Sequence, residues 1–478
     1  MVRLRPNPVF AVALISLFAT GCTSTRFGDV FRASTAPKAT DEGTVVRATL
    51  LMPIEAAAVQ DAPAHLTVGQ VAELQITELS VEALVAEVLV RNPSLSQMVA
   101  AWQAASARYP QARSLEDPML STMFAPASFG SNSVETGYRV EVSQKIPFPG
   151  KLRLRGQGAL AEASAAQNDI EDMRVQLAEA TKQAFYEYYL VERAIAVNEE
   201  SLRLLGEFKQ SAESRYKTGL VPQQDILQAE VEIGRQQERA VTLERMRKVA
   251  VARINTLRSL PPDEALASPP KTLKVTPGLP SAAILRSLAV SQRPDLKALQ
   301  DRITVEENSL KLALREYYPD VEVAAAYDTI MGNGPMRDLA PQVGIRMNLP
   351  VRHARRHAAV AEAQAKVSQR QSEYASRVNQ IQFQVQEAYE QLVESERVLG
   401  LYEKSILPAA QENVKAAQAA YVTGKTPFLS LIEAQRNLVN LRDRNYEATA
   451  DYFRRLATLE RVIGGPLDAS GLEPSHHK

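Results

Sequence analysis

Cysteine, tryptophan and net charge are scarce in this chain of 478 residues. It has one cysteine, Cys22, and one tryptophan, and its 55 Lys and Arg residues balance 55 Asp and Glu residues. A single cysteine excludes a disulfide within the chain. A chain of zero formal charge lacks the global field that attracts nucleic acid, so we expect no nucleic-acid partner.

Long hydrophobic runs and enzyme motifs are also missing. After the N-terminal segment, no stretch has the roughly 18 consecutive apolar residues that a transmembrane helix needs. The chain has no P-loop, no GxGxxG or GxSxG motif and no paired-cysteine zinc motif. His353 and His357 have a spacing that can bring two imidazoles to one metal ion, but no third ligand accompanies them. We therefore expect no catalytic site, no metal site and no bound cofactor.

The N-terminus has the layout of a secretory signal. Arg3 and Arg5 precede an apolar run from Val9 to Phe18, and small residues then lead to Cys22. This segment resembles a bacterial lipobox, in which a peptidase cuts before the cysteine and the thiol carries lipid such as palmitate. We expect residues 1–21 to be a signal peptide and Cys22 to be lipidated. The alternative is an incidental cysteine.

The segment after Cys22 shows no sign of a packed domain. From Thr23 to Thr77 it is rich in Ala, Thr, Pro and Asp and lacks a sustained helical period. We interpret residues 22–79 as an extended, lipidated leader. At the other end, residues 467–478 are expected to form a C-terminal tail.

The remainder of the chain contains two copies of one unit. The motif Ser80-Val-Glu-Ala-Leu recurs as Ser281-Ala-Ala-Ile-Leu, at an offset of 201 residues, and Gly219 recurs as Gly424 at an offset of 205. A period this long indicates a duplicated domain, because solenoid repeats are only about 20–50 residues long. The sequence therefore predicts two units, at 80–280 and 281–466.

Each unit contains two segments with the alternation of a two-faced strand. Val140 and Val142 alternate with Arg139, Glu141 and Ser143, which places apolar and polar side chains on opposite faces. The pattern predicts strands at 118–126, 134–145, 320–329 and 341–349. Strands of about 9–11 residues with one apolar face are typical of outer-membrane barrels, and the alternative is a half-buried soluble sheet. Four strands cannot close a barrel, which needs at least about eight, so a barrel requires several chains.

Two unusually long helices are predicted. The segment from Lys151 to Tyr216 contains no proline, and the segment from Arg352 to Tyr421 is interrupted only at Pro408. Each spans on the order of 100 Å at 1.5 Å per residue. Such helices cannot fold around one compact core and must pack against other helices on more than one face. The alternative, a cytoskeletal coiled coil, does not account for the signal or the strands.

Each long helix ends in the same kind of turn. Gly219 and Gly424 suit the left-handed position that follows a helix, and Pro222 and Pro427 suit the start of the next helix. The chain therefore reverses at two tips, at 218–222 and 423–427. The returning helices are expected to run antiparallel to the first ones.

The two tips share a longer pattern, Tyr-x-x-Gly followed by a short turn and an acidic stretch. It comprises Tyr216, Gly219 and Asp225-Ile-Leu-Gln-Ala-Glu230 in the first unit, and Tyr421, Gly424 and Ser430-Leu-Ile-Glu-Ala-Gln435 in the second. In this pattern the chain resembles the TolC-like outer-membrane efflux family, over nearly all of residues 80–466. The stretch Ile146-Pro-Phe-Pro-Gly-Lys151 further resembles the branch of that family that serves heavy-metal efflux.

The resemblance implies a mainly α fold with a membrane β-barrel part. Three chains would share a twelve-stranded barrel in the outer membrane, and their helical hairpins would form a tunnel through the periplasm. Such a lipid-anchored duct conducts substrates passively. It receives them from an inner-membrane pump, here of the RND type, through a periplasmic adaptor protein. The sequence leaves open whether the substrates are metal cations or small organic compounds.

The resemblance also implies a narrow lower end lined by acidic residues. The matching positions are Ser430 and Glu433, and the first unit supplies Asp225 at the position equivalent to Ser430. We therefore predict a gate with rings of Asp225 and Glu433, where like charges would converge and attract cations. The alternative is a solvated helix face.

The tips are the predicted contact surface for the adaptor, because turns on rigid hairpins point outward. The candidate contact residues are Gly219, Leu220, Gly424 and Lys425. The alternative role of these residues is chain reversal alone.

A basic cluster follows the last strand of each unit. Long cationic side chains at the junction of barrel and tunnel would reach the phosphates of outer-membrane lipid. The candidates for this headgroup contact are Lys151, Arg153, Arg155, Arg352, Arg355 and Arg356. The alternative is solvation with pairing to nearby carboxylates.

Two functions of other classes are alternatives. A periplasmic adaptor lipoprotein of an efflux pump also has an exported start and a helical hairpin, but it normally has one hairpin, whereas this sequence predicts two. A cell-envelope enzyme would need a nucleophile or a metal cluster, and the sequence lacks the motifs of both.

Overall fold

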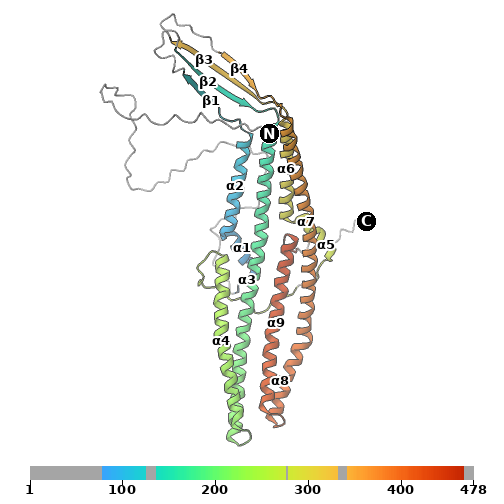
Figure 1. Ribbon diagram of the computed structural model, residues 1–478. Coiled ribbons are helices and arrows are strands. Elements are labelled where there is room, and N and C mark those ends of the chain that lie inside the picture. The colour runs from blue at the N-terminus through green and yellow to red at the C-terminus, as the bar shows by residue number, and fades with distance from the viewer. Residues whose placement is uncertain (1–77, 125–135, 276–277, 332–341, 468–478) are drawn as a thin grey trace, which may run out of the picture. The chain divides into compact units, whose positions relative to one another are not determined.

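The computed structural model describes residues 78–124, 136–275, 278–331 and 342–467. Cys22, most of the leader and most of the C-terminal tail lie outside these ranges. The first unit contains α1 (Val81–Arg91), α2 (Pro93–Arg113), β1 (Met119–Phe124), β2 (Thr136–Ile146), α3 (Lys151–Lys217) and α4 (Gln223–Leu257). The second contains α5 (Ala282–Gln292), α6 (Pro294–Arg315), β3 (Val321–Met331), β4 (Gln342–Met347), α7 (His353–Leu401), the π-helix η2 (Tyr402–Ile406), α8 (Leu407–Val422) and α9 (Phe428–Ile463) (Figure 1). The order of elements is the same in both units, with α7, η2 and α8 together in the place of α3, which confirms the predicted internal repeat.

The short helices at the start of each unit break at a proline. Pro93 and Pro294 begin α2 and α6, because a proline at the first helical position loses no hydrogen bond that the helix would otherwise make. The residue before each proline ties the start of its unit to the end of the returning helix. Asn92 Nδ2 donates to the Leu257 carbonyl at 2.9 Å, and an Arg293 guanidinium N–H donates to the equivalent carbonyl, that of Val462, also at 2.9 Å.

The four strands form one antiparallel sheet in sequence order. β2 and β3, which come from different units, pair along their whole lengths. β4 ends at Met347, two residues before the predicted end. At that point the Asn348 side-chain oxygen accepts the Asp320 N–H at 2.6 Å, and the Asn348 N–H donates to the Asp320 carbonyl at 3.4 Å.

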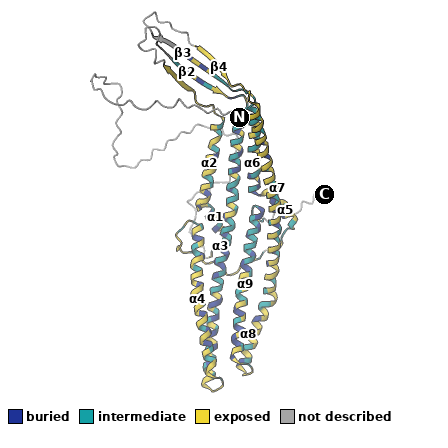
Figure 2. Ribbon diagram, in the orientation of Figure 1, coloured by how far each residue is buried: buried dark blue, intermediate teal, exposed yellow. Residues whose placement is uncertain are grey.

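The sheet exposes apolar side chains on one face and buries polar side chains on the other, which is the reverse of the pattern in a soluble protein. On one face the polar residues Glu141 and Ser143 are each 8% exposed, and their partners across β3 are Ala326 and Ala324. On the other face the apolar side chains are open, as in Ile345, which is 70% exposed. Figure 2 shows exposed residues along the strands. An outward apolar face is stable only in apolar surroundings, which favours the barrel interpretation over the soluble sheet.

The helices are held by separate apolar clusters along their lengths. α3 has 67 residues and packs against α2, α4, α6 and α9, while α7 packs against α5, α6 and α9. One cluster around Tyr188 and Ile254 joins α1, α3, α4 and α9, and a second around Ile381 and Leu459 joins α5, α6, α7 and α9. Within the described ranges, no helix is both long enough and apolar enough to span a membrane.

The two long helices differ in one respect. α3 is continuous, whereas the predicted interruption near Pro408 takes the form of the five-residue π-helix η2 between α7 and α8. Pro408 has no N–H to donate within the helix, and the wider π turn accommodates the missing hydrogen bond. The second hairpin therefore contains a π-helical turn at a height where α3 of the first hairpin is a regular α-helix.

Candidate functional site

The two hairpin tips are built by the same hydrogen bonds. Gly219 and Leu220 donate their N–H groups to carbonyls of the last turn of α3 at 2.9 Å each, and Gly424 and Lys425 do the same for α8 at 3.0 and 2.9 Å. Gly219 and Gly424 have φ values of 72° and 71°, which L-residues with side chains rarely adopt. All four predicted contact residues are exposed at the ends of the hairpins.

Asp225 lies in the first turn of α4 and faces the second hairpin. Its Oδ2 accepts a hydrogen bond from the Tyr421 hydroxyl at 3.2 Å. The Arg215 guanidinium lies 5.2 Å from the centre of the Tyr421 ring and donates to the Val422 carbonyl at 2.7 Å. The Tyr421 ring also contacts Phe428, with 5.2 Å between ring centres. Tyr421 therefore connects the two tips within one chain.

Burial has the largest effect on the pKa values of Asp225 and Tyr421. It raises the pKa of Asp225, although the Tyr421 hydrogen bond and the Arg215 charge oppose the shift. Burial and the neighbouring Asp225 raise the pKa of Tyr421 to about 12. A carboxyl whose pKa is raised on folding stabilises the fold most when it is protonated, and this contribution is lost as the pH rises through its titration range. Acidification therefore favours this arrangement of Asp225.

Ser430 and Glu433 lie elsewhere. They line a groove of about 510 Å³ between α8 and α9, together with Asn413, Ala416, Ala417, Ala420, Thr426, Ala434 and Asn437. Glu433 is exposed and Ser430 is half-buried. Asp225 does not line this groove, so the structure brings Ser430 and Glu433 together but not Asp225 and Glu433. A ring that combines the two acids must use neighbouring chains.

The headgroup interpretation is wrong for Lys151. Its side chain is fully buried, with Nζ 2.9 Å from Asp320 Oδ1 and 3.3 Å from Glu316 Oε2. Asp320 also accepts the Phe148 N–H at 2.9 Å. The acids come from the loop before β3, in the other unit, and they hold the ammonium inside the protein. Lys151 is therefore a structural ion-pair partner at the junction of sheet and helices.

The remaining basic candidates divide into two groups. Arg356 donates from Nε to the Glu316 carbonyl at 2.7 Å, so its guanidinium is already engaged. Arg352 and Arg355 are exposed and line a groove of about 480 Å³ with Leu349 and Val351. In the first unit, Arg153 is exposed and Arg155 is half-buried. Arg356 lines the same groove, and headgroup contact stays a prediction for Arg153, Arg155, Arg352, Arg355 and Arg356.

The histidine pair packs around a tyrosine. The Tyr317 hydroxyl lies 3.1 Å from His357 Nδ1, and the Tyr317 ring stacks on His353 with 6.3 Å between ring centres. Within the described part of the chain, no group of three or more His, Cys, Asp or Glu side chains is placed to hold a metal ion.

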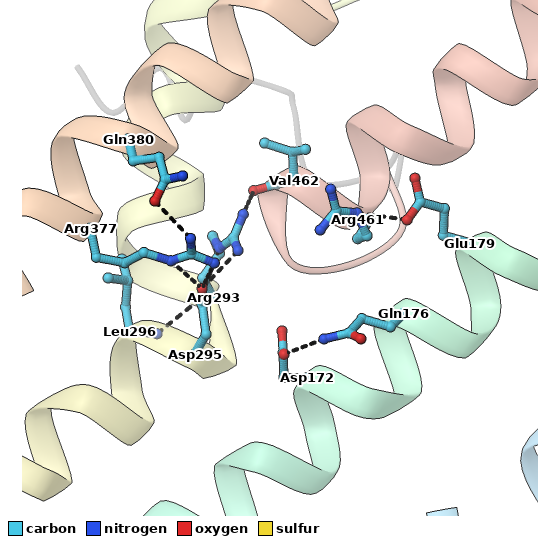
Figure 3. Close-up of polar contacts among 10 residues, drawn as sticks. All are labelled: Asp172, Gln176, Glu179, Arg293, Asp295, Leu296, Arg377, Gln380, Arg461 and Val462. Atoms are coloured by element: carbon cyan, nitrogen blue, oxygen red, sulfur yellow. Dashed lines mark hydrogen bonds and ion pairs between the residues drawn. The ribbon is translucent and has the colours of Figure 1, made fainter. Parts of the chain in front are cut away.

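One buried polar cluster was missed by sequence reasoning (Figure 3). Arg293 is 3% exposed and donates to both oxygens of Asp295 at 2.8 Å, while Arg377 of α7 donates to the same carboxylate at 2.8 and 3.0 Å. A comparison of the two repeats could have pointed to this cluster, because the second repeat has charged residues where the first has uncharged ones. The equivalent residues of the first unit, Asn92 and Ser94, are uncharged, so of the two units only the second has an ion pair at this position.

Comparisons with known proteins agree with this architecture. Residues 84–258 and 285–465 match the model of the family described as "Outer membrane efflux protein". The chain is 21% identical to the cobalt-zinc-cadmium resistance protein CzcC of Cupriavidus metallidurans over 398 residues, which cover 81% of this chain and 90% of that one. It is 20% identical to toxin and drug export protein A of Aggregatibacter actinomycetemcomitans over 345 residues, which cover 68% and 74% of the two chains.

Solved structures share the fold. The outer-membrane channel OprN has a TM-score of 0.69 and 20% identity, and the match covers 80% of this chain and 90% of that one. CusC has a TM-score of 0.67 and 17% identity, with coverages of 86% and 99%. The predicted fold class and efflux-channel function are confirmed, and the adaptor alternative is set aside. This chain, with its two strand-and-hairpin units, belongs to the outer membrane efflux protein family.

Proposed function

We propose that three copies of this chain form one passive outer-membrane channel that catalyses no reaction. The inverted sheet carries this proposal, because its exposed apolar face fits lipid and its opposite face carries polar residues such as Glu141 and Arg346, which suit an aqueous lumen. Four strands are too few to close, and both edge strands, β1 and β4, have a free side on which a neighbouring chain can pair. Three chains supply twelve strands, above the minimum of about eight.

The channel receives its substrates from an inner-membrane pump of the RND type through a periplasmic adaptor that binds the exposed tips. A photo-cross-linker at Leu220 or Lys425 should capture the adaptor in cells, and capture of no adaptor from either position would refute this docking. The substrates are metal cations or small organic compounds, because the chain is similar both to a relative named for metal resistance and to one named for drug export.

Glu433, with Ser430 beside it, is the proposed constriction at the lower end. Purified protein should run as a trimer in SDS without heating and should conduct ions in planar lipid bilayers. Glu433→Ala should weaken cation selectivity, because carboxylates that meet at a threefold axis attract cations. It should also raise conductance, because the smaller side chains leave a wider passage. Asp225→Ala tests the second acidic position in the same assay. A monomeric, non-conducting protein would contradict the channel, whereas unaltered conductance and selectivity in both variants would contradict only the gate.

We also propose that lipid on Cys22 anchors the chain to the outer membrane. Several acyl chains hold firmly, at roughly 0.8 kcal/mol for each buried CH₂ group. Cells grown with labelled palmitate should label the wild-type protein but not Cys22→Ala. Continued labelling of Cys22→Ala would refute lipidation at this residue.

A further inference from the structure

The first unit's junction between sheet and helices is covered by the second unit. Just after β2, the Phe148 ring stacks on Tyr318 with 4.5 Å between ring centres, and an Arg315 guanidinium N–H donates to the Pro149 carbonyl at 3.1 Å. Tyr318 and Arg315 come from the end of α6 and the turn before β3. The same region holds the buried Lys151 ammonium through two carboxylates. The turn that precedes β3 therefore covers the turn that follows β2.

The equivalent junction of the second unit is open. Val351 occupies the position of Phe148, at an offset of 203 residues, but it is 72% exposed. Leu349, two residues earlier, is 70% exposed. Together with Arg352 and Arg355 these side chains line the groove of about 480 Å³ described above, here called the junction groove. A single chain therefore leaves apolar surface uncovered at this junction, which is typical of a contact surface.

The strand register indicates what lies on the junction groove. β2 and β3 pair with Ile146 opposite Val321. The equivalent residues of the other two strands are Leu349, at an offset of 203, and Leu120, at an offset of 201. β4 and β1 are the edge strands and run antiparallel to one another, so β4 can pair in this register with β1 of a neighbouring chain. Leu349 then lies opposite Leu120 of the neighbouring chain, and residues 114–118 before β1, here called the α2–β1 turn, lie over the junction groove.

The α2–β1 turn and the junction groove are complementary. The turn carries Leu115, which is 47% exposed, and the exposed acid Asp117. Within the described part of the chain, Asp117, Arg352 and Arg355 have no ion-pair partner. Glu316 also lines the groove, but its carboxylate is 3.3 Å from the buried lysine of the first junction. Unpaired opposite charges beside exposed apolar side chains on the two surfaces favour contact between them.

We propose that the α2–β1 turn of one chain binds in the junction groove of the next. Asp117 pairs there with Arg352 and Arg355. Leu115 covers Val351. Three such contacts link the ring, so assembly completes in the second unit the junction that folding completes in the first. The inference rests on the proposed trimeric channel, and it assigns Arg352 and Arg355 to a neighbouring chain rather than to lipid headgroups.

Cross-linking tests the register. A short bis-methanethiosulfonate reagent applied to the full-length trimer carrying Leu120→Cys with Leu349→Cys should give dimers and trimers that survive boiling in SDS without reductant. Leu120→Cys with Val343→Cys is the matched control and should give only monomers, because Val343 lies roughly 20 Å further along β4 at about 3.3 Å per residue. Each single-cysteine variant controls for Cys22. Absence of cross-linking through position 349 in an intact trimer would overturn the register.

Charge reversal tests the ion pair. In detergent free of phospholipid, Arg352→Glu with Arg355→Glu should raise the monomer fraction in unheated SDS samples at least about fivefold, because repulsion replaces attraction at three places in the ring. Adding Asp117→Arg should return the monomer fraction to within about twofold of wild type, because the two changes are coupled. Lys297→Glu with Lys311→Glu is the matched control. Both lysines are exposed on α6, which packs against α3 and α7 of its own chain, so this variant should change the monomer fraction less than about twofold.

Lipid contact would give another pattern. The double glutamate variant would then weaken the trimer only in vesicles that contain phosphatidylglycerol, and Asp117→Arg would not rescue it, which would overturn the proposal. A wild-type protein that runs only as a monomer would instead refute the trimeric channel itself.

Discussion

Replacing Asp320 with alanine should lower the free energy of unfolding by about 3 kcal/mol or more, because it leaves the Lys151 ammonium buried without its nearest partner. Glu316 stays 3.3 Å from Lys151 Nζ, but its side chain is 45% exposed and compensates only in part. The Phe148 N–H loses its acceptor as well. Urea unfolding in detergent would measure the change. The single tryptophan, Trp102, packs beside the buried Leu95 and Ile170 and serves as the fluorescent probe.

A nearby exposed ion pair is the matched control. Lys145 and Glu116 are 3.9 Å apart and both are at least half exposed, so Glu116→Ala should change stability by no more than about 0.5 kcal/mol. The double variant Lys151→Met with Asp320→Leu should recover most of the lost stability, because replacing a whole buried ion pair by apolar residues is often neutral. Equal losses from Asp320→Ala and Glu116→Ala would show that burial of Lys151 contributes little.

Replacing Asp295 with alanine should cost a similar amount, about 3–5 kcal/mol, because Arg293 and Arg377 share its carboxylate and Arg293 is almost fully buried. The effect should depend on pH. Burial disfavours the charged carboxylate, but hydrogen bonds and charges from the two arginines outweigh it and hold the pKa of Asp295 below its usual range. A carboxyl with a lowered pKa contributes stability above its unfolded pKa and loses it as the pH falls through its folded pKa. The gap between wild type and Asp295→Asn should therefore be widest near neutral pH and should close in strong acid.

Asp172 is the internal control for this prediction. Burial, and then the charge of Asp295, raise its pKa, so its linkage has the opposite sign. Asp172→Asn should therefore leave the protein as stable as wild type, or more stable, at neutral pH. Gln176 Nε2, which now donates to Asp172 Oδ2 at 2.6 Å, can donate to the new amide oxygen in the same way. Parallel pH profiles for Asp295→Asn and Asp172→Asn would contradict the assignment of charge within this cluster.

Much of the fold follows from local patterns. Alternation from Arg139 to Ser143 specifies the two faces of β2, since side chains alternate across any strand. Gly219 and Gly424 mark the tips because their backbone conformation excludes most other residues. Pro93 and Pro294 mark helix starts for an equally local reason. Each of these features depends on a few neighbouring residues and can be read without the rest of the chain.

The site residues were less predictable, because their roles depend on distant partners. Lys151 and Arg352 occupy similar places after the last strand of their units, yet one is buried and the other exposed. The difference comes from Asp320, 169 residues from Lys151 in the chain. Asp225 and Glu433 both follow a tip. Only Asp225 accepts a hydrogen bond from Tyr421 of the other hairpin, which is 196 residues away in the chain.

Periodicity, turn residues and internal repetition determined from the sequence alone that this protein is a duplicated strand-and-hairpin chain, because these signals are local or self-referring, and the tip motifs added a resemblance to the outer-membrane efflux family. Only the tertiary structure determines which charged side chains are buried and which pairs of residues connect the two hairpins. Those outcomes are set by contacts such as Glu232–Arg436, between residues 204 positions apart. Burial of a charge depends on whether a partner arrives to replace its water, and that is a property of the folded chain.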